Sequence, residues 1–158
     1  MDQDSLSGIV QKVFQTQLKQ ILTHLNGCVE GQDPIHLHDL RVANRRTRVA
    51  LKVFKPLLPD QTYSRFREDF RWIQGITGEV RDLDVSLAHY ANYRKQVAKS
   101  WRKELKPLKK YLEDKRDVAQ LKLRGDLGSG RFKEVIDSWT EFLESHSWDD
   151  PALGLESA

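Results

Sequence analysis

Residues 38–54 read His-Asp-Leu-Arg-Val-Ala-Asn-Arg-Arg-Thr-Arg-Val-Ala-Leu-Lys-Val-Phe, a stretch with two chemically opposite faces. On a helix that turns about 100° per residue, its basic side chains fall in one stripe about 80° wide. That stripe consists of His38, Arg41, Arg45, Arg48 and Lys52. The other side carries small and apolar residues: Leu40, Ala43, Thr47, Ala50, Leu51, Phe54 and Leu58. One face therefore suits a protein core, and the other suits an anion.

Helical spacing also precedes this stretch. Apolar residues recur at intervals of three and four from the start of the chain, which predicts a first helix that ends near Asn26-Gly27. A second helix is predicted over residues 34–57. Asp33 would cap it, because an aspartate side chain accepts from free N–H groups at a helix start. Pro59 would end it.

The spacing continues toward the C-terminus. A third helix is predicted from residues 60–62, with a kink or short break at residues 75–78 and continuation into the 90s. The next apolar stripe comprises Tyr93, Val97, Trp101, Leu105, Leu108 and Leu112. Pro107 should bend or restart that helix, and Ser129 should cap a last one.

The chain shows no convincing strand alternation. We therefore predict an all-α fold, an antiparallel helical bundle of about four to five helices. Residues 1–146 are expected to form this single bundle, and residues 147–158 an acidic, flexible tail.

Composition excludes several classes of protein. The 158 residues contain no run of apolar residues long enough to span a membrane, so we expect no membrane partner. The polar N-terminus does not resemble a secretory signal. Cys28 is the single cysteine, which excludes an internal disulfide and a cysteine-rich zinc site. The cytoplasm is the expected location.

Charge is distributed in blocks. Lys and Arg number 26 and Asp and Glu 23, for a net charge of +3. Residues 35–57 carry a net +5, residues 94–125 carry +8, and residues 126–158 carry −6. Two basic blocks in a nearly neutral chain indicate a polyanionic partner, although a solvated charged surface would give the same totals.

The stripe on residues 38–52 favours the polyanion interpretation. Cations spaced by three and four residues repel one another, and no carboxylate lies in this stripe to offset that cost. Arginine predominates, and its planar fork suits phosphate oxygens. Arg41 to Lys52 spans roughly 16 Å of helix, which fits a chain of phosphates better than one phosphate ester. Arg46 and Lys55 flank the stripe.

Further basic residues extend the pattern. Arg67, Arg71, Gln74, Gly78 and Arg81 would share one face of a nearly continuous helix, where the glycine would admit a ligand or a second backbone. A third group contains Lys95, Lys99, Arg102, Lys106 and Lys110. Nearby carboxylates dilute this third group, so that a solvated surface is an equally good interpretation of it.

Other site chemistries find weaker support. His36 and His38 would point to different sides of a helix, and no carboxylate or thiol completes a metal site. A phosphate-binding glycine loop and a nucleophile-base arrangement are both absent. Asp82 and Asp84 are expected to orient arginines or to cap a helix. The sequence therefore predicts a non-catalytic binding module that requires no metal or other cofactor.

Three alternatives stay open. The chain could bind nucleic acid, although we expect nucleic acid to act only as a competing polyanion. It could be an enzyme acting on polyphosphate, for which Glu79, Asp82 and Asp84 are the nearby acidic candidates. It could also be an adaptor whose acidic tail folds onto the basic face.

Residues 38–54 resemble the signature of the CHAD domain, the conserved histidine α-helical domain. Residues 78–85, Gly-Glu-Val-Arg-Asp-Leu-Asp-Val, resemble the second signature of that family, and residues 129–132 are similar to its pattern near the last helix. The resemblance implies a helical bundle that binds inorganic polyphosphate and occurs at polyphosphate granules. Ligand contacts are implied for His38, Arg41, Arg45, Arg48, Lys52, Arg71 and Arg81. From charge and helical position we add Arg46, Lys55, Arg67, Lys99 and Lys106 to the predicted polyphosphate site.

The resemblance covers roughly residues 5–146 and corresponds to the first of the two related halves usual in the family. A second His-x-x-Arg helix is absent from the sequence. We expect either a piece of a longer protein or a half-length protein that forms a homodimer, which would rebuild a pseudo-two-fold pair. In such a dimer the two basic stripes would line one shared groove.

Overall fold

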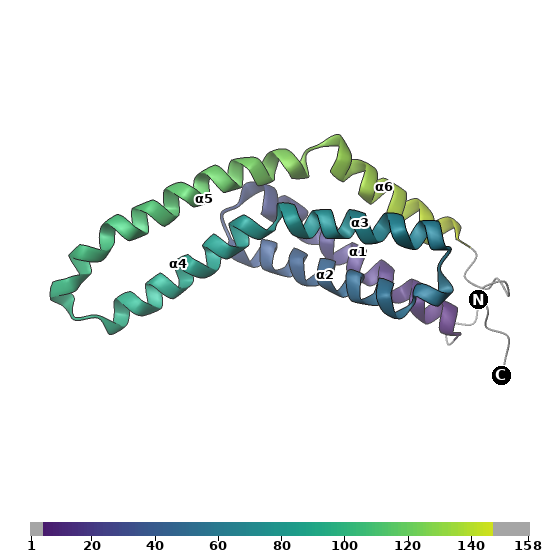
Figure 1. Ribbon diagram of the computed structural model, residues 1–158, viewed down its shortest axis with the longest axis horizontal. Helices are drawn as coiled ribbons and strands as arrows, with labels where there is room; N and C mark the ends of the chain where they lie inside the picture. The colour runs from purple at the N-terminus through teal and green to yellow at the C-terminus, as the bar shows by residue number, and fades with distance from the viewer. Residues whose placement is uncertain (1–4, 147–158) are drawn as a thin grey trace.

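The computed structural model describes residues 5–146 (Figure 1). These residues form six α-helices: α1 (Leu6–Glu30), α2 (Pro34–Val53), α3 (Asp60–Ile76), α4 (Gly78–Gln96), α5 (Lys106–Leu127) and α6 (Gly130–Ser145). Two short 3₁₀ segments, η1 (Lys55–Leu57) and η2 (Lys99–Leu105), join α2 to α3 and α4 to α5. The described part of the chain contains no strand, so the predicted all-α bundle is confirmed.

The helices divide into a packed body and a protruding arm (Figure 1). In the body, α1, α2, α3 and α6 lie side by side with the adjoining ends of α4 and α5. The arm is the outer part of α4 and α5, joined by η2 at its far end. We call residues 94–110 the arm tip. Over residues 5–146, no helix combines the length and the apolarity needed to cross a bilayer.

Aromatic rings from three helices hold the body together. Trp139 of α6 is fully buried, and its ring centroid lies 5.1 Å from that of Phe14 on α1. On α3, the ring centroids of Phe66 and Phe70 lie 4.6 and 5.3 Å from that of Trp139. These edge-on contacts are favourable beyond simple burial. The core therefore orients α1, α3 and α6 and leaves their other faces exposed.

Several helix ends follow the sequence-based predictions. The Asp33 side chain accepts from the N–H of Ile35 at 3.0 Å, and Ser129 Oγ accepts from the N–H of Phe132 at 3.3 Å. A short break at Thr77 separates α3 from α4. Pro107 lies in the first turn of α5, where it restarts the helix.

Two predicted helix ends were wrong. α1 does not stop at Asn26-Gly27 but continues to Glu30. Gly27 serves packing instead of ending the helix, because the ring of His36 leaves no room for a side chain there. Gly31 ends the helix instead, with a left-handed φ of 70° and its N–H donating to the Gly27 carbonyl. At its other end, α2 stops at Val53, and η1 continues the turn to Leu57.

The predicted apolar stripe between Tyr93 and Leu112 was also wrong. Its residues are divided among α4, η2 and α5, because the chain reverses at η2. Tyr93 and Trp101 are 58% and 62% exposed, so they lie on the surface of the arm. The predicted tail, residues 147–158, lies outside the described residues.

A buried polar network fixes the root of the arm. Arg116 of α5 donates from Nε to the buried carboxylate of Asp84 on α4, and from Nη2 to the Gly31 carbonyl at 2.9 Å. Gln120 Nε2 donates to the carbonyls of Cys28 and Val29 at 2.9 and 3.2 Å. Asp84 thus orients an arginine, as predicted, and the network ties α4 and α5 to the end of α1.

Candidate polyanion-binding site

Two adjoining hollows lie where α2 meets α3 and the start of α4. The first, of about 320 Å³, is lined by His38, Arg41, Val42, Asn44, Arg45, Arg48, Gln74 and Arg81. The second, of about 310 Å³, is lined by Arg48, Leu51, Lys52, Tyr63, Arg67 and Arg71. Because Arg48 lines both, the two hollows adjoin at this side chain, and we call them together the basic groove.

The groove brings together eight of the predicted site residues. Five come from α2 (His38, Arg41, Arg45, Arg48 and Lys52), two from α3 (Arg67 and Arg71) and one from α4 (Arg81). The predicted stripe along α2 and the predicted second basic face thus line the same depression. Helical geometry is sufficient to predict each face, whereas their convergence depends on the packing of α2 against α3.

The buried face of α2 sets the direction of its basic face. Leu40 and Thr47 are fully buried, and Leu51 is nearly so. Asn44, also buried, donates from Nδ2 to the Phe70 carbonyl at 3.0 Å and so fastens α2 to α3. With this side of the helix held in the core, the stripe from His38 to Lys52 faces the groove.

Arg41 holds the inner end of the groove together. Its Nη1 donates to Thr77 Oγ1 at 2.8 Å and to the Gln74 carbonyl at 3.0 Å, at the break between α3 and α4. Burial of the guanidinium lowers the pKa of Arg41, the carboxylate of Asp82 opposes that shift, and the charge of Arg81 adds to it. An arginine titrates so far above neutrality that the side chain stays cationic.

Gly78 lies beside this guanidinium. A Cβ at this position would lie 3.6 Å from Arg41 Nη1, which is an ordinary contact distance. No second backbone of the described residues approaches Gly78 closely, and the nearby Arg41 side chain does not require a glycine.

In the described chain the groove cations are not paired with carboxylates at salt-bridge distance, although Asp82 acts on Arg41 electrostatically. Within residues 5–146, none of the eight basic residues of the groove forms a salt bridge. Asp39, the one carboxylate of residues 35–57, instead has its Oδ2 3.6 Å from His24 Nε2 on α1. Arg45, Lys52, Arg67 and Arg71 are exposed, and the other four are partly buried. The groove therefore presents uncompensated positive charge to solvent.

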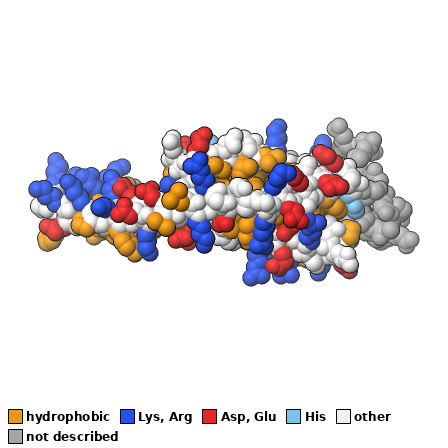
Figure 2. Space-filling model, turned by 90° about the horizontal axis from the view of Figure 1, so that it is seen from above, with side chains coloured by type: hydrophobic (Ala, Val, Ile, Leu, Met, Phe, Trp, Pro, Cys, Tyr) orange, Lys and Arg blue, Asp and Glu red, His pale blue; other side chains and the backbone are white. Residues whose placement is uncertain are grey.

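Four predicted residues lie outside the groove. Arg46 is exposed on α2 and lines neither hollow. Lys55 borders the groove, with its ammonium 4.9 Å from the ring centroid of Tyr63. Lys99 and Lys106 belong to the arm tip, which extends away from the body because α4 leaves the bundle (Figure 1). Figure 2 shows Lys and Arg side chains gathered at this far end of the arm.

Two groove residues were missed in the sequence. Asn44 and Tyr63 line the hollows, but no helical pattern distinguishes them from neighbouring buried residues. Both are largely buried, and they reach the lining of the groove only because α2 packs against α3.

The described residues contain no group of three or more His, Cys, Asp or Glu side chains placed to hold a metal ion. His36 Nδ1 lies 3.0 Å from His24 Nδ1, whereas His38 lines the groove, so the two predicted histidines point to different surroundings. Cys28 is buried, and desolvation raises the pKa of its thiol to about 12. The groove is thus a collection of hydrogen-bond donors and positive charges.

A search of the curated proteins finds no match to this chain. The family model of the CHAD domain matches residues 12–157, nearly the whole chain. That family is associated with polyphosphate-related proteins. The chain belongs to the CHAD domain family.

Proposed function

We propose that the basic groove binds inorganic polyphosphate and that the domain is a non-catalytic binding module. The observation that carries this proposal is the convergence of eight basic residues from α2, α3 and α4 on one depression without salt bridges inside the described chain. A ligand with closely spaced negative charges would supply the missing countercharges. Membership of a family associated with polyphosphate-related proteins supports this choice.

The dimensions of the groove suit a linear phosphate chain. Along α2, Arg41 to Lys52 spans roughly 16 Å at the rise of an α-helix. Arg67 and Arg71 line the same depression from α3, so a chain lying in it would meet cations on both walls. Arginine forks donate two parallel hydrogen bonds to phosphate oxygens, and successive phosphates offer such oxygens repeatedly.

The acidic candidates for catalysis do not gather in the groove. Asp84 is paired with Arg116 at the root of the arm. Glu79 lines a different hollow with Trp72 and Lys122. Asp82 influences Arg41 electrostatically. These placements support a binding role, and an assay of orthophosphate release from polyphosphate with added Mg²⁺ tests it. Steady release would contradict the non-catalytic proposal.

The proposal is tested by a pair of variants matched in charge. The groove variant carries Arg45→Gln, Arg48→Gln and Arg71→Gln, and the tip variant carries Lys99→Gln, Lys103→Gln and Lys106→Gln. Both lose three positive charges from exposed or partly buried positions. Titration calorimetry with long-chain polyphosphate should show affinity about 100-fold lower for the groove variant, at a net 1 kcal/mol or more per charged hydrogen bond. The tip variant should bind like the unmodified protein.

Equal losses in the two variants would mean that binding follows total charge, and would overturn the groove as the site. Competition by RNA or DNA at matched phosphate concentration separates the main alternative. We expect polyphosphate to displace nucleic acid, which we treat only as a competing polyanion. Nucleic acid that resists displacement would favour the nucleic-acid function. Polyphosphate binding would also direct the protein to polyphosphate granules in the cytoplasm.

A further inference from the structure

The arm tip combines positive charge with an exposed aromatic side chain. Residues 94–110 contain eight Lys and Arg residues and one acidic residue, Glu104, for a net charge of +7. Trp101 lies on η2 at the end of the arm and is 62% exposed. Leu108, on the first turns of α5, is 47% exposed. The ring surface of an indole finds no apolar partner on a bare phosphate chain, so the tip suits a partner with an apolar part.

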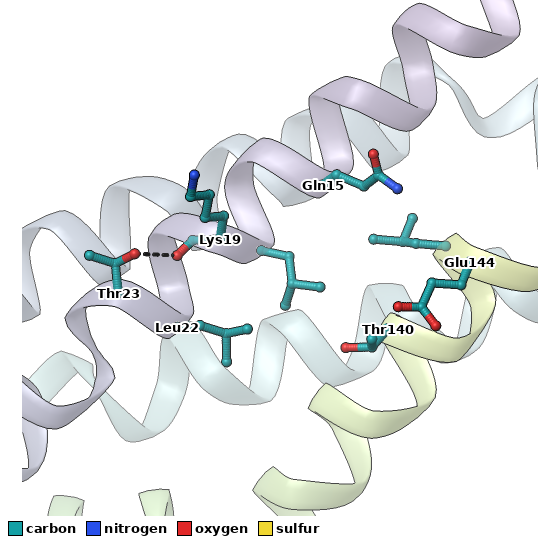
Figure 3. A pocket seen from close by; sticks show the side chains of 8 residues that line it. Gln15, Lys19, Leu22, Thr23, Thr140 and Glu144 are labelled. Carbon is teal, nitrogen blue, oxygen red and sulfur yellow. Dashed lines mark hydrogen bonds between the residues drawn. The ribbon is translucent and has the colours of Figure 1, made fainter. Parts of the chain in front are cut away.

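A hollow that suits such a side chain lies on the body between α1 and α6 (Figure 3). It measures about 420 Å³ and is lined by Gln15, Leu18, Lys19, Leu22, Thr23, Thr140, Leu143 and Glu144. Leu22 is 46% exposed and forms part of its wall. Figure 3 shows the Thr140 and Glu144 side chains on α6 across from Leu22 on α1. The hollow thus offers apolar surface with polar groups at its rim.

The outer face of α6 beside this hollow is acidic. Exposed carboxylates recur at Glu134, Asp137, Glu141 and Glu144. Glu134 pairs with Arg65, and Asp137 pairs with Lys133. Glu141 and Glu144 take part in no salt bridge within residues 5–146. Glu144 lines the α1–α6 hollow together with Lys19, whereas Glu141 lines a neighbouring hollow between α3 and α6. The acidic face of α6 therefore lies along one edge of the α1–α6 hollow.

We propose that the arm tip of one copy of this chain docks into the α1–α6 hollow of a second copy. Trp101 would occupy the hollow, and Arg102 and Lys103 would meet Glu141 and Glu144. A protruding tryptophan among cations suits an open, partly apolar hollow that lies beside the acidic outer face of α6. Buried tryptophan and arginine side chains typically dominate the energy of such contacts.

The contact must join separate molecules. The arm tip and the outer half of α6 lie at opposite ends of the protein, so one chain cannot bring its own Trp101 to its own hollow (Figure 1). Because the two surfaces differ, each copy retains one free tip and one free hollow after pairing. Such a head-to-tail contact builds rings or open chains rather than a closed two-fold dimer. The basic groove stays free in this arrangement.

Two complementary variants test this contact in the absence of polyphosphate. One is Trp101→Ala, and the other, the hollow variant, combines Glu141→Lys with Glu144→Lys. Sedimentation velocity of the unmodified protein at low salt should give an average mass that rises with concentration past that of a dimer. Each variant alone should weaken association about 30-fold, the loss typical of a dominant interface residue. All three substituted side chains are exposed, so folding should persist.

Mixing the two variants gives the sharpest result. Trp101→Ala has an intact hollow, and the hollow variant has an intact tip. A mixture of the two should therefore form a one-to-one complex that grows no further. Tyr111→Ala, which removes another exposed aromatic of the arm, should leave association unchanged. A protein that stays monomeric at every concentration would overturn the proposal. So would a mass that stops at a dimer, or variants that fail to complement each other.

This test is independent of the groove. Trp101→Ala should bind polyphosphate as the unmodified protein does, because Trp101 lies outside the groove. Loss of self-association with retained polyphosphate binding would therefore separate the two sites.

Discussion

The basic groove and the arm tip are both rich in positive charge, but they differ in shape and chemistry. The groove is concave, and its eight basic residues come from three helices. Six of them are arginines, and the other two are His38 and Lys52. The tip is a protruding turn with six lysines, two arginines and the exposed Trp101. Residues 94–125 carry the higher net charge in the sequence, yet the cations converge on the groove. Density of charge along a chain therefore does not locate a site; packing does.

The cause of the difference is how much of each helix is buried. α2 holds one face in the core, so its opposite face has a fixed direction and meets the basic face of α3. The arm has only α4, η2 and α5, and no residue of η2 is buried. Its cations gather on the protruding end of the arm and line none of the hollows that form the groove.

The largest expected effect is a loss of stability on substitution at the root of the arm. Replacing Arg116 by Met would leave the Asp84 carboxylate buried without its partner, because the Asp84 side chain is only 2% exposed. We expect a loss of about 3 kcal/mol in unfolding free energy, measured by urea denaturation. Lys133→Met removes the exposed pair with Asp137 and should leave the denaturation midpoint unchanged. Equal effects would show that the buried network does not hold the arm.

A smaller effect distinguishes two arginines of the groove. Arg41→Gln breaks hydrogen bonds to Thr77 and the Gln74 carbonyl, so it should cost about 1–2 kcal/mol of stability and also weaken polyphosphate binding. Arg45→Gln should weaken binding with little change in stability, because Arg45 is exposed and has no internal salt bridge within residues 5–146. Thermal denaturation and calorimetry on both variants measure the difference. An unchanged melting temperature for Arg41→Gln would contradict its role in joining α2 to the break between α3 and α4.

The smallest expected effect is a change in how polyphosphate affinity depends on salt concentration. Polyanion binding releases condensed counterions, so affinity falls with salt by a slope of about 0.7 per contacting cation for single-stranded polymers. The groove variant with three substituted arginines should therefore flatten the slope of log K against log salt by about 2. The tip variant with three substituted lysines should keep the full slope. Flattening by the tip variant would place phosphate contacts on the arm.

Much of the fold and of the candidate site was predictable because it depends on local helical geometry. The two faces of residues 38–54 follow from a turn of about 100° per residue. The common face of Arg67, Arg71 and Arg81 follows from the same rule, since the break at Thr77 is short. Asp33 and Ser129 cap helices through contacts to residues only two or three positions away.

Features that depend on distant contacts were not predictable in this way. Gly27 lies inside α1 because it packs against the ring of His36, and the helix ends at the left-handed Gly31; helical periodicity reveals neither feature. Residues 93–112 have the spacing of one helix, yet the chain turns back at η2 and exposes Trp101. That turn carries Lys99 and Lys106 away from the groove. Charge and periodicity predict which residues share one face of a helix, but they do not predict which other helix packs beside that face.

The most direct measurement of polyphosphate recognition is an NMR titration of the isotope-labelled protein that follows the arginine side-chain Nε–H signals. On addition of long-chain polyphosphate, we expect the signals of Arg45, Arg48 and Arg71 to shift first and together, while the backbone signals of residues 94–110 stay in place. If the arm tip responds at lower polyphosphate concentration than the groove arginines, or if the groove arginines do not respond, the groove is not the binding site.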